Sequence, residues 1–311
     1  MTNIYFCCVY YYVRHIISNG FFYLIMKNIR DLNSGDEEGL NSQEYYYLLE
    51  LDDLVSSNLK KKRDGNSSPI YLEIEGGSIV KLDLVSCHLS SVPQVVWEFE
   101  RLIELDLDRN GIETIPSTIE KLKLLEVLSL SDNKLDVFPE PLTKVTSLQS
   151  LNLAHNNIVS MPSSIGRLKL LRHLALNDNR LKTLPESIGE LKSLKTFYLK
   201  DNELENLPEG FGGLVSLAET TLRNNRLKTI PESIGNLKNL SYFCLSNNYL
   251  EQLPDTIGNM ESLSTLWLDG NKVKSLPSSI TNLKSLKKIL LKGNPLISVP
   301  DALIKDFIDI I

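Results

Sequence analysis

Proline recurs along this chain every 23 residues without a slip. Ten of the thirteen prolines keep that spacing: Pro93, Pro116, Pro139, Pro162, Pro185, Pro208, Pro231, Pro254, Pro277 and Pro300. Asparagine keeps the same period at Asn110, Asn133, Asn156, Asn179, Asn202, Asn225, Asn248, Asn271 and Asn294. A constant period of this length indicates a tandem array, in which each unit packs against its neighbours.

The apolar residues of one unit predict how it folds. In the unit that begins at Leu171, Leu174 and Leu176 alternate with other residues, and Leu181 and Leu184 follow. This alternation predicts a short strand whose leucines turn to one side while the intervening side chains point outward. One unit cannot bury its leucines alone, so we expect stacked units with their strands about 4.8 Å apart in a parallel inner sheet.

The polar and special residues of the unit have structural interpretations. An asparagine amide can donate to and accept from backbone groups where the chain leaves the strand, so we expect a ladder of asparagines. Proline suits the start of the return segment, because its missing N–H costs no sheet bond there. We expect tight bends at the glycines that follow it: Gly166, Gly189, Gly212, Gly235 and Gly258.

The unit LxxLxLxxNxLxxLPxxIGxLxx resembles the leucine-rich repeat. In its 23-residue form, over roughly residues 70–311, it is similar to the intracellular, Ras-suppressor-like class that also occurs in Scribble, Erbin and the plant Ras-group-related repeat proteins. The resemblance implies an α/β fold: a right-handed, horseshoe-shaped solenoid of about ten coils with a parallel inner sheet. It also implies a protein-binding scaffold, often one that works in signalling around small GTPases.

We expect five segments along the chain. They are an apolar N-terminal segment (1–25), a polar helix and linker (26–68), a capping hairpin with a first degenerate coil (69–92), the leucine-rich repeats (93–300) and a C-terminal cap (301–311). The hairpin is expected because apolar residues alternate around Gly76 and Gly77. A final helix that begins near Asp301 would close the far end of the stack.

Three interpretations of the N-terminal segment compete: a signal peptide, a membrane span and a stretch that precedes the true start of translation. A signal peptide would carry basic residues before its apolar run, but none precedes Arg14. A membrane span would place Arg14 and His15 near its centre, which is costly. We therefore expect either that translation starts at Met26, so that residues 1–25 are not part of the protein, or that they form a weak anchor.

Composition narrows the function. The net charge of −6 argues against a nucleic-acid binder, which usually shows a basic surplus. The four cysteines form no paired framework, which favours a reducing, cytoplasmic location. No phosphate-binding loop, nucleophile motif or metal-ligand spacing occurs, so we expect no enzyme activity, cofactor or metal. A membrane partner is not expected either, and the chain is predicted to be a monomer.

The outward strand positions are where a partner would bind. The central outward row reads Asp83, Asp106, Ser129, Asn152, Ala175, Tyr198, Thr221, Cys244, Trp267 and Leu290. It changes from acidic to aromatic, and exposed tyrosine, tryptophan and arginine are the usual anchors of protein interfaces. The residues predicted to contact a protein partner on the concave face are Tyr198, Lys200, Glu219, Arg223, Tyr242, Trp267 and Asp269.

The sequence leaves two other functions open. The chain can be the recognition subunit of a kinase, GTPase or ubiquitin-ligase system whose catalytic part is a separate chain. It can also be a receptor for a small ligand or carbohydrate, since tryptophan and tyrosine stack on sugars. Our preferred hypothesis is a non-catalytic interaction scaffold in intracellular signalling, with a small GTPase or another signalling protein as its partner.

Overall fold

The computed structural model describes residues 42–61, 71–297 and 299. The N-terminal segment 1–25, Met26 and the expected C-terminal cap 301–311 lie outside the described residues. The strands are β1 (Tyr71–Glu75), β2 (Ser78–Asp83), β3 (Glu104–Asp106), β4 (Val127–Ser129), β5 (Ser150–Asn152), β6 (His173–Ala175), β7 (Thr196–Tyr198), β8 (Glu219–Thr221), β9 (Tyr242–Cys244), β10 (Thr265–Trp267) and β11 (Lys288–Leu290).

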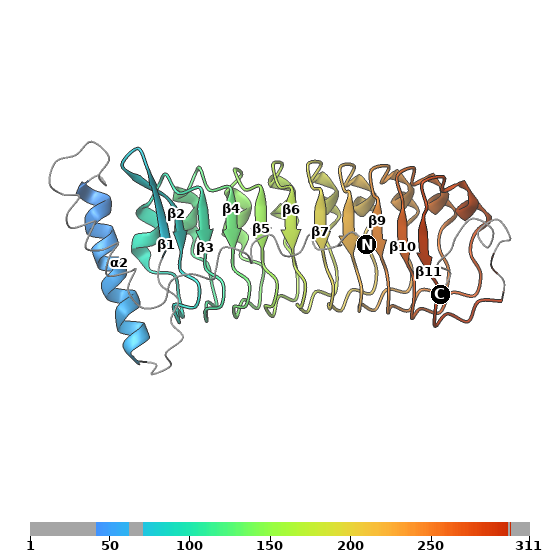
Figure 1. The fold of residues 1–311 in the computed structure, drawn as a ribbon, viewed down its shortest axis with the longest axis horizontal. Coiled ribbons are helices and arrows are strands. Elements are labelled where there is room, and N and C mark those ends of the chain that lie inside the picture. The colour runs from blue at the N-terminus through green and yellow to red at the C-terminus, as the bar shows by residue number, and fades with distance from the viewer. Residues whose placement is uncertain (1–41, 62–70, 298, 300–311) are drawn as a thin grey trace.

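These strands form one 11-stranded sheet in chain order, β1 to β11 (Figure 1). From β2 onward every neighbouring pair is parallel, and residues 23 positions apart stand directly opposite, as Leu174 does to Phe197. The first pair differs, because β1 runs antiparallel to β2 around a turn at Gly76 and Gly77, both with positive φ. The predicted leucine-rich-repeat solenoid is confirmed, with ten strands running in parallel from β2 to β11.

The return segments on the outer side are short 3₁₀ helices. They are η2 (Gln94–Glu98), η3 (Ser117–Lys121), η4 (Glu140–Lys144), η5 (Ser163–Arg167), η6 (Glu186–Glu190), η7 (Glu209–Gly213), η8 (Glu232–Asn236), η9 (Asp255–Asn259) and η10 (Ser278–Asn282). A repeated proline immediately precedes each of them, and its carbonyl accepts the first hydrogen bond, as Pro185 does from the Ile188 N–H at 3.0 Å. Proline therefore starts each turn without giving up a sheet bond.

The outer glycines serve close packing, which corrects the expectation of tight bends. Among the described glycines, positive φ occurs only at Gly76, Gly77, Gly270 and Gly293, so Gly189 and its equivalents have ordinary backbone angles. A Cβ atom added to Gly189 would instead fall on the carbonyl oxygen of Gly210 in the next coil. Glycine at this position thus lets successive 3₁₀ helices approach each other closely.

The core is a column of leucine side chains between the sheet and the 3₁₀ helices. Leu171, Leu176 and Leu181 of one coil are fully buried, as are their counterparts in neighbouring coils. Thr220 stands where other coils have an apolar residue, and its hydroxyl donates to the Phe197 carbonyl at 2.7 Å. A buried hydroxyl with a partner costs little, so this coil keeps the packing of the others.

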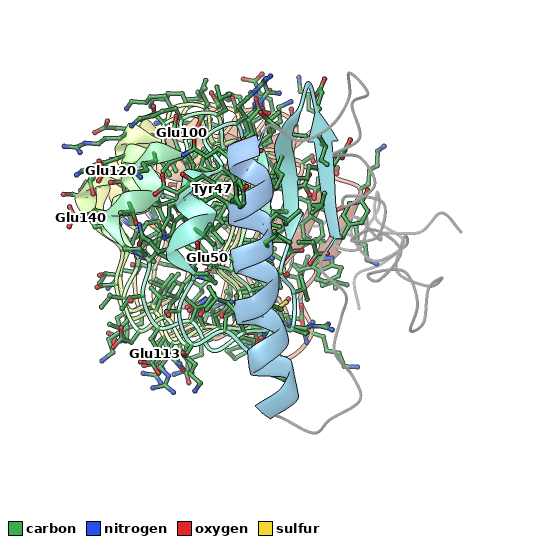
Figure 2. The ribbon with its side chains drawn as sticks, turned by 90° about the vertical axis from the view of Figure 1, so that its left-hand side faces the viewer. Tyr47, Glu50, Glu100, Glu113, Glu120 and Glu140 are labelled. Carbon is green, nitrogen blue, oxygen red and sulfur yellow. The ribbon has the colours of Figure 1, made fainter. Side chains whose placement is uncertain are left out.

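Helix α2 (Ser42–Lys61) closes the N-terminal end of the stack. Figure 2, which views the molecule from that end, shows α2 lying across the first coil beside the hairpin. Leu48, Leu51 and Val55 are buried, and the Tyr47 ring meets Phe99 edge-on at 6.2 Å. The sequence predicted a polar helix and linker within residues 26–68, and the structure places the helix at Ser42–Lys61.

Candidate functional site

The concave face, the side of the sheet that points away from the leucine core, carries three rows of side chains over β7–β10. In the central row Tyr198, Thr221, Cys244 and Trp267 stand side by side, as the sequence predicted. Glu219 and Tyr242 are neighbours in the row before it. Each member of the third row follows the central row by two residues: Lys200, Arg223 and Asp269. The seven predicted partner-binding residues therefore come from neighbouring coils.

An aromatic pair lies at the centre of this surface. The ring centroids of Tyr242 and Trp267 are 5.4 Å apart at an interplanar angle of 71°, an edge-on contact. Both side chains are half-buried, and burial together with the neighbouring Cys244 thiol raises the pKa of Tyr242. Cys244 itself is only 1 % exposed. It belongs to the row that points outward, but it forms part of the floor and not of the accessible surface.

Most polar groups around the pair already have partners inside the chain. The Tyr198 hydroxyl donates to Glu219 Oε2 at 3.4 Å, and Lys200 Nζ lies 2.8 Å from Asp201. The Ser246 hydroxyl donates to Asp269 Oδ1 at 2.5 Å. Ser246 was not predicted to take part, because a buried serine beside the strand gives no signal in the sequence beyond its outward position.

Two donors differ from these groups. Arg223 Nε and Trp267 Nε1 are both buried from solvent, and neither has a hydrogen-bond partner within the described part of the chain. The ion pairs among the described residues do not include Arg223. A buried donor without an acceptor is unfavourable and uncommon in native proteins. Of the six buried side-chain atoms without a partner among the described residues, these two nitrogens are the ones on the outward rows of the sheet.

The acidic end of the concave face is arranged differently. Asp108 Oδ1 accepts from the Ser129 hydroxyl at 2.5 Å and from the Ser131 N–H at 2.7 Å. Asp106 Oδ1 accepts from the Asp108 N–H at 2.9 Å. These carboxylates support the backbone where the chain leaves the strands. Because these carboxylates already accept hydrogen bonds within the chain, their negative charge alone is no evidence of a binding site over the early coils.

The described residues give no indication of metal chemistry or of a membrane span. No group of three or more histidine, cysteine, aspartate or glutamate side chains is placed to hold a metal ion within the ranges that the structure describes. No helix among those residues has the length and apolar character needed to cross a bilayer.

Family comparisons detect leucine-rich repeats along most of the described chain. A model of the leucine-rich repeat region matches residues 160–245 and 225–307. Two further leucine-rich repeat models match residues 78–135 and 147–168. No curated protein matches the sequence. The matched ranges agree with the coils of the solenoid, and they carry no sign of the Ras-suppressor-like class in particular.

Among solved structures, the chain is similar to plant receptors. It is 33% identical to the plant peptide hormone receptor RGFR1, in complex with RGF2, over 66% of this chain and 34% of that one, with a TM-score of 0.60. It is 30% identical to the leucine-rich-repeat ectodomain of the receptor kinase GASSHO1/SCHENGEN3 from Arabidopsis thaliana, in complex with CASPARIAN STRIP INTEGRITY FACTOR 2, over 74% and 29%, with a TM-score of 0.66.

A TDR receptor is 25% identical over 73% of this chain and 45% of that one, with a TM-score of 0.61. The chain thus spans less than half the length of each of these receptors. Their shared fold supports a protein-binding scaffold in general terms.

Proposed function

We propose, for a chain whose fold is that of a leucine-rich-repeat solenoid, that it is a non-catalytic scaffold which grips an extended segment of a protein partner. The segment lies on the concave face over β7–β10. The observation that carries this proposal is the cluster of Tyr198, Tyr242 and Trp267 around two buried donors without acceptors. Half-buried aromatic side chains and arginine are the groups on which most interface energy concentrates.

The similar receptors support a peptide or protein partner. The structures of RGFR1 and GASSHO1/SCHENGEN3 contain RGF2 and CASPARIAN STRIP INTEGRITY FACTOR 2, respectively. A regular row of outward positions on parallel strands suits a chain that lies across many coils and offers one residue to each. We propose the same geometry here, with the tyrosine and tryptophan rings as the anchors.

We propose further that the scaffold works in the cytoplasm, as a monomer, in signalling through a small GTPase or another signalling protein. The described cysteines, Cys87 and Cys244, are both free and buried, as is usual in a reducing compartment. The likeness of the 23-residue unit to the intracellular class supports the same location. The plant receptor ectodomains make an extracellular peptide receptor the competing proposal.

Affinity capture with paired variants tests the binding surface. Proteins from native lysate are retained on the wild-type chain and on a Tyr242→Ala, Trp267→Ala variant, and identified by mass spectrometry. If the rings are anchors, each substitution should weaken binding of the identified partner by about 2 kcal/mol, which is roughly 30-fold in Kd. The melting temperature should stay unchanged.

Tyr249→Ala provides the matched control. Tyr249 follows the ladder residue Asn248, beyond the three rows, and its exposed ring lies 4.9 Å from Lys272 Nζ. This variant should retain the partner fully. Equal retention of the partner by the wild type and the double variant would show that the site is elsewhere.

A further inference from the structure

The two donors without acceptors lie on either side of one coil. Arg223 follows β8 and Trp267 ends β10, so the β9 coil passes between them. Neighbouring parallel strands are about 4.8 Å apart, which places the two flanking coils about 10 Å from each other. An arginine side chain and an indole ring can both reach over the strand between them. A group lying on the β9 coil would therefore have a donor-bearing coil on each side.

Between the two donors, the outward residues of the β9 coil have short side chains. Its two outward residues between the donors are Cys244 and Ser246, which are small and almost fully buried. The third outward residue, Tyr242, packs edge-on against the Trp267 ring. Neighbouring side chains cover both small residues, among them Asp269, whose carboxylate accepts from the Ser246 hydroxyl, and the Tyr242 and Trp267 rings form an aromatic wall on one side.

The carboxylates near Arg223 make their hydrogen bonds with other residues. Glu219 accepts from Tyr198, Asp269 accepts from Ser246, and Asp201 accepts from Asn224 at 2.6 Å while pairing with Lys200. None of these hydrogen bonds involves Arg223, whose charge acts on Asp201 only alongside Lys200 and Asn224, the two hydrogen-bond donors that lower the pKa of that carboxyl. Lys288 and Lys292 of the last coil add positive charge at the same end of the sheet. A ligand group that satisfies both donors should accordingly be an acceptor and carry negative charge.

We infer that Arg223 and Trp267 form a subsite on the β9 coil for an anionic oxygen group of the bound segment, an aspartate or glutamate carboxylate or a phosphate. The inference rests on the proposed function, because it assigns the partner chemistry of the same surface. It adds that the partner segment is acidic where it crosses β9, next to a residue that contacts the Tyr242 and Trp267 rings.

The indole N–H signals of the full chain give a direct readout. The protein has two tryptophans, and Trp97 is buried in the core at 0% exposure, so a nitrogen-15 NMR spectrum separates a core signal from that of Trp267. The chain is titrated with three blocked tripeptides whose central residue is glutamate, phosphoserine or glutamine. We expect a saturable shift of the Trp267 signal with an anionic tripeptide and none with glutamine.

The two anionic tripeptides separate the sources, since the one that saturates at lower concentration identifies a carboxylate or a phosphate as the preferred group. Arg223→Lys keeps the positive charge but removes the Nε donor. It should weaken binding of the anionic tripeptide about tenfold. Arg226→Lys is the control, because Arg226 pairs with Glu203 at 3.0 Å outside the three rows, and it should leave the affinity unchanged. An unmoved Trp97 signal shows that each variant is folded.

Equal shifts with glutamine and glutamate, no shift with any tripeptide, or an unaltered affinity in Arg223→Lys would each overturn the subsite. Failure of the proposed function has a different signature. If the captured partner is lost in the Tyr242→Ala, Trp267→Ala variant but kept by Arg223→Lys with normal affinity, the binding face stands and only the anionic subsite is wrong. If the double variant keeps the partner, the binding face itself is wrong.

Discussion

Asn179 shows what asparagine does at each turn out of the sheet. Its Nδ2 donates to the carbonyl of Leu153 in the preceding coil at 2.9 Å and to Leu176 in its own coil at 3.2 Å, while its Oδ1 accepts from the Ile158 N–H at 2.9 Å. The same contacts recur at all nine asparagines of the period. One side chain therefore joins two coils through groups that would otherwise be buried unpaired.

Asn179→Ala should lower the free energy of unfolding by at least about 2 kcal/mol, because the Ile158 N–H and the Leu153 carbonyl would lose their partner. Urea unfolding followed by circular dichroism measures the change. Asn236→Ala alters an exposed asparagine at the end of η8 and should stay within about 0.5 kcal/mol of the wild type. Comparable losses in the two variants would contradict the ladder account.

Helix α2 covers the apolar end of the first coil, which no repeat covers. The first coil has no preceding coil to cover its apolar residues, and α2 packs Leu48 and Leu51 against that end. The helix is also tied to the sheet by a buried contact, because Glu44 Oε2 accepts from the Ile79 N–H at 2.7 Å. Terminal caps of this kind keep a solenoid from exposing its core.

Leu51→Ala should destabilise the protein by about 2–5 kcal/mol, because Leu51 is fully buried between α2 and the first coil. Leu54→Ala, on the exposed side of the same helix, should have little effect. Thermal unfolding measures both, and size-exclusion chromatography detects self-association of an uncovered end. If the two leucines gave equal effects, α2 would not be the cap.

Across the whole molecule the arrangement of strands stays the same from coil to coil, whereas the residues on the outward face of the sheet change. The carboxylates of Asp83, Asp106 and Asp108 over the early coils accept hydrogen bonds from nearby backbone groups. The late coils combine aromatic rings with the unpartnered nitrogens of Arg223 and Trp267. An extended partner would therefore bind with its own charges distributed unevenly, the acidic part over the late coils.

Asn239 allows a test of the proposed cytoplasmic location. The sequence Asn239-Leu240-Ser241 is an acceptor motif for N-linked glycans, and Asn239 is exposed. The motif also occurs at Asn66, outside the described residues. A cytoplasmic chain should show no change in mass when the protein from its native cell is treated with a glycosidase. A loss of mass would place it in the secretory route and favour the extracellular peptide receptor.

The period of proline and asparagine by itself determined the fold, since residues 23 apart in the sequence must occupy equivalent places in a stack. It also determined which residues share a row on the concave face, because strand alternation fixes the outward positions. The registers of Tyr198 with Thr221 and of Cys244 with Trp267 are those that the period requires.

Only the tertiary structure decided how those residues meet. The sequence placed Cys244 outward like its neighbours, but the Tyr242 and Trp267 rings pack over this coil and the thiol is buried. It assigned the outer glycines to bends, whereas the close approach of Gly189 to the next coil is set by stacking. The unpartnered nitrogens of Arg223 and Trp267 were equally invisible, because whether a donor finds an acceptor depends on side chains from three coils at once. A repeat fixes the position of each side chain, and contacts between neighbouring repeats fix its environment.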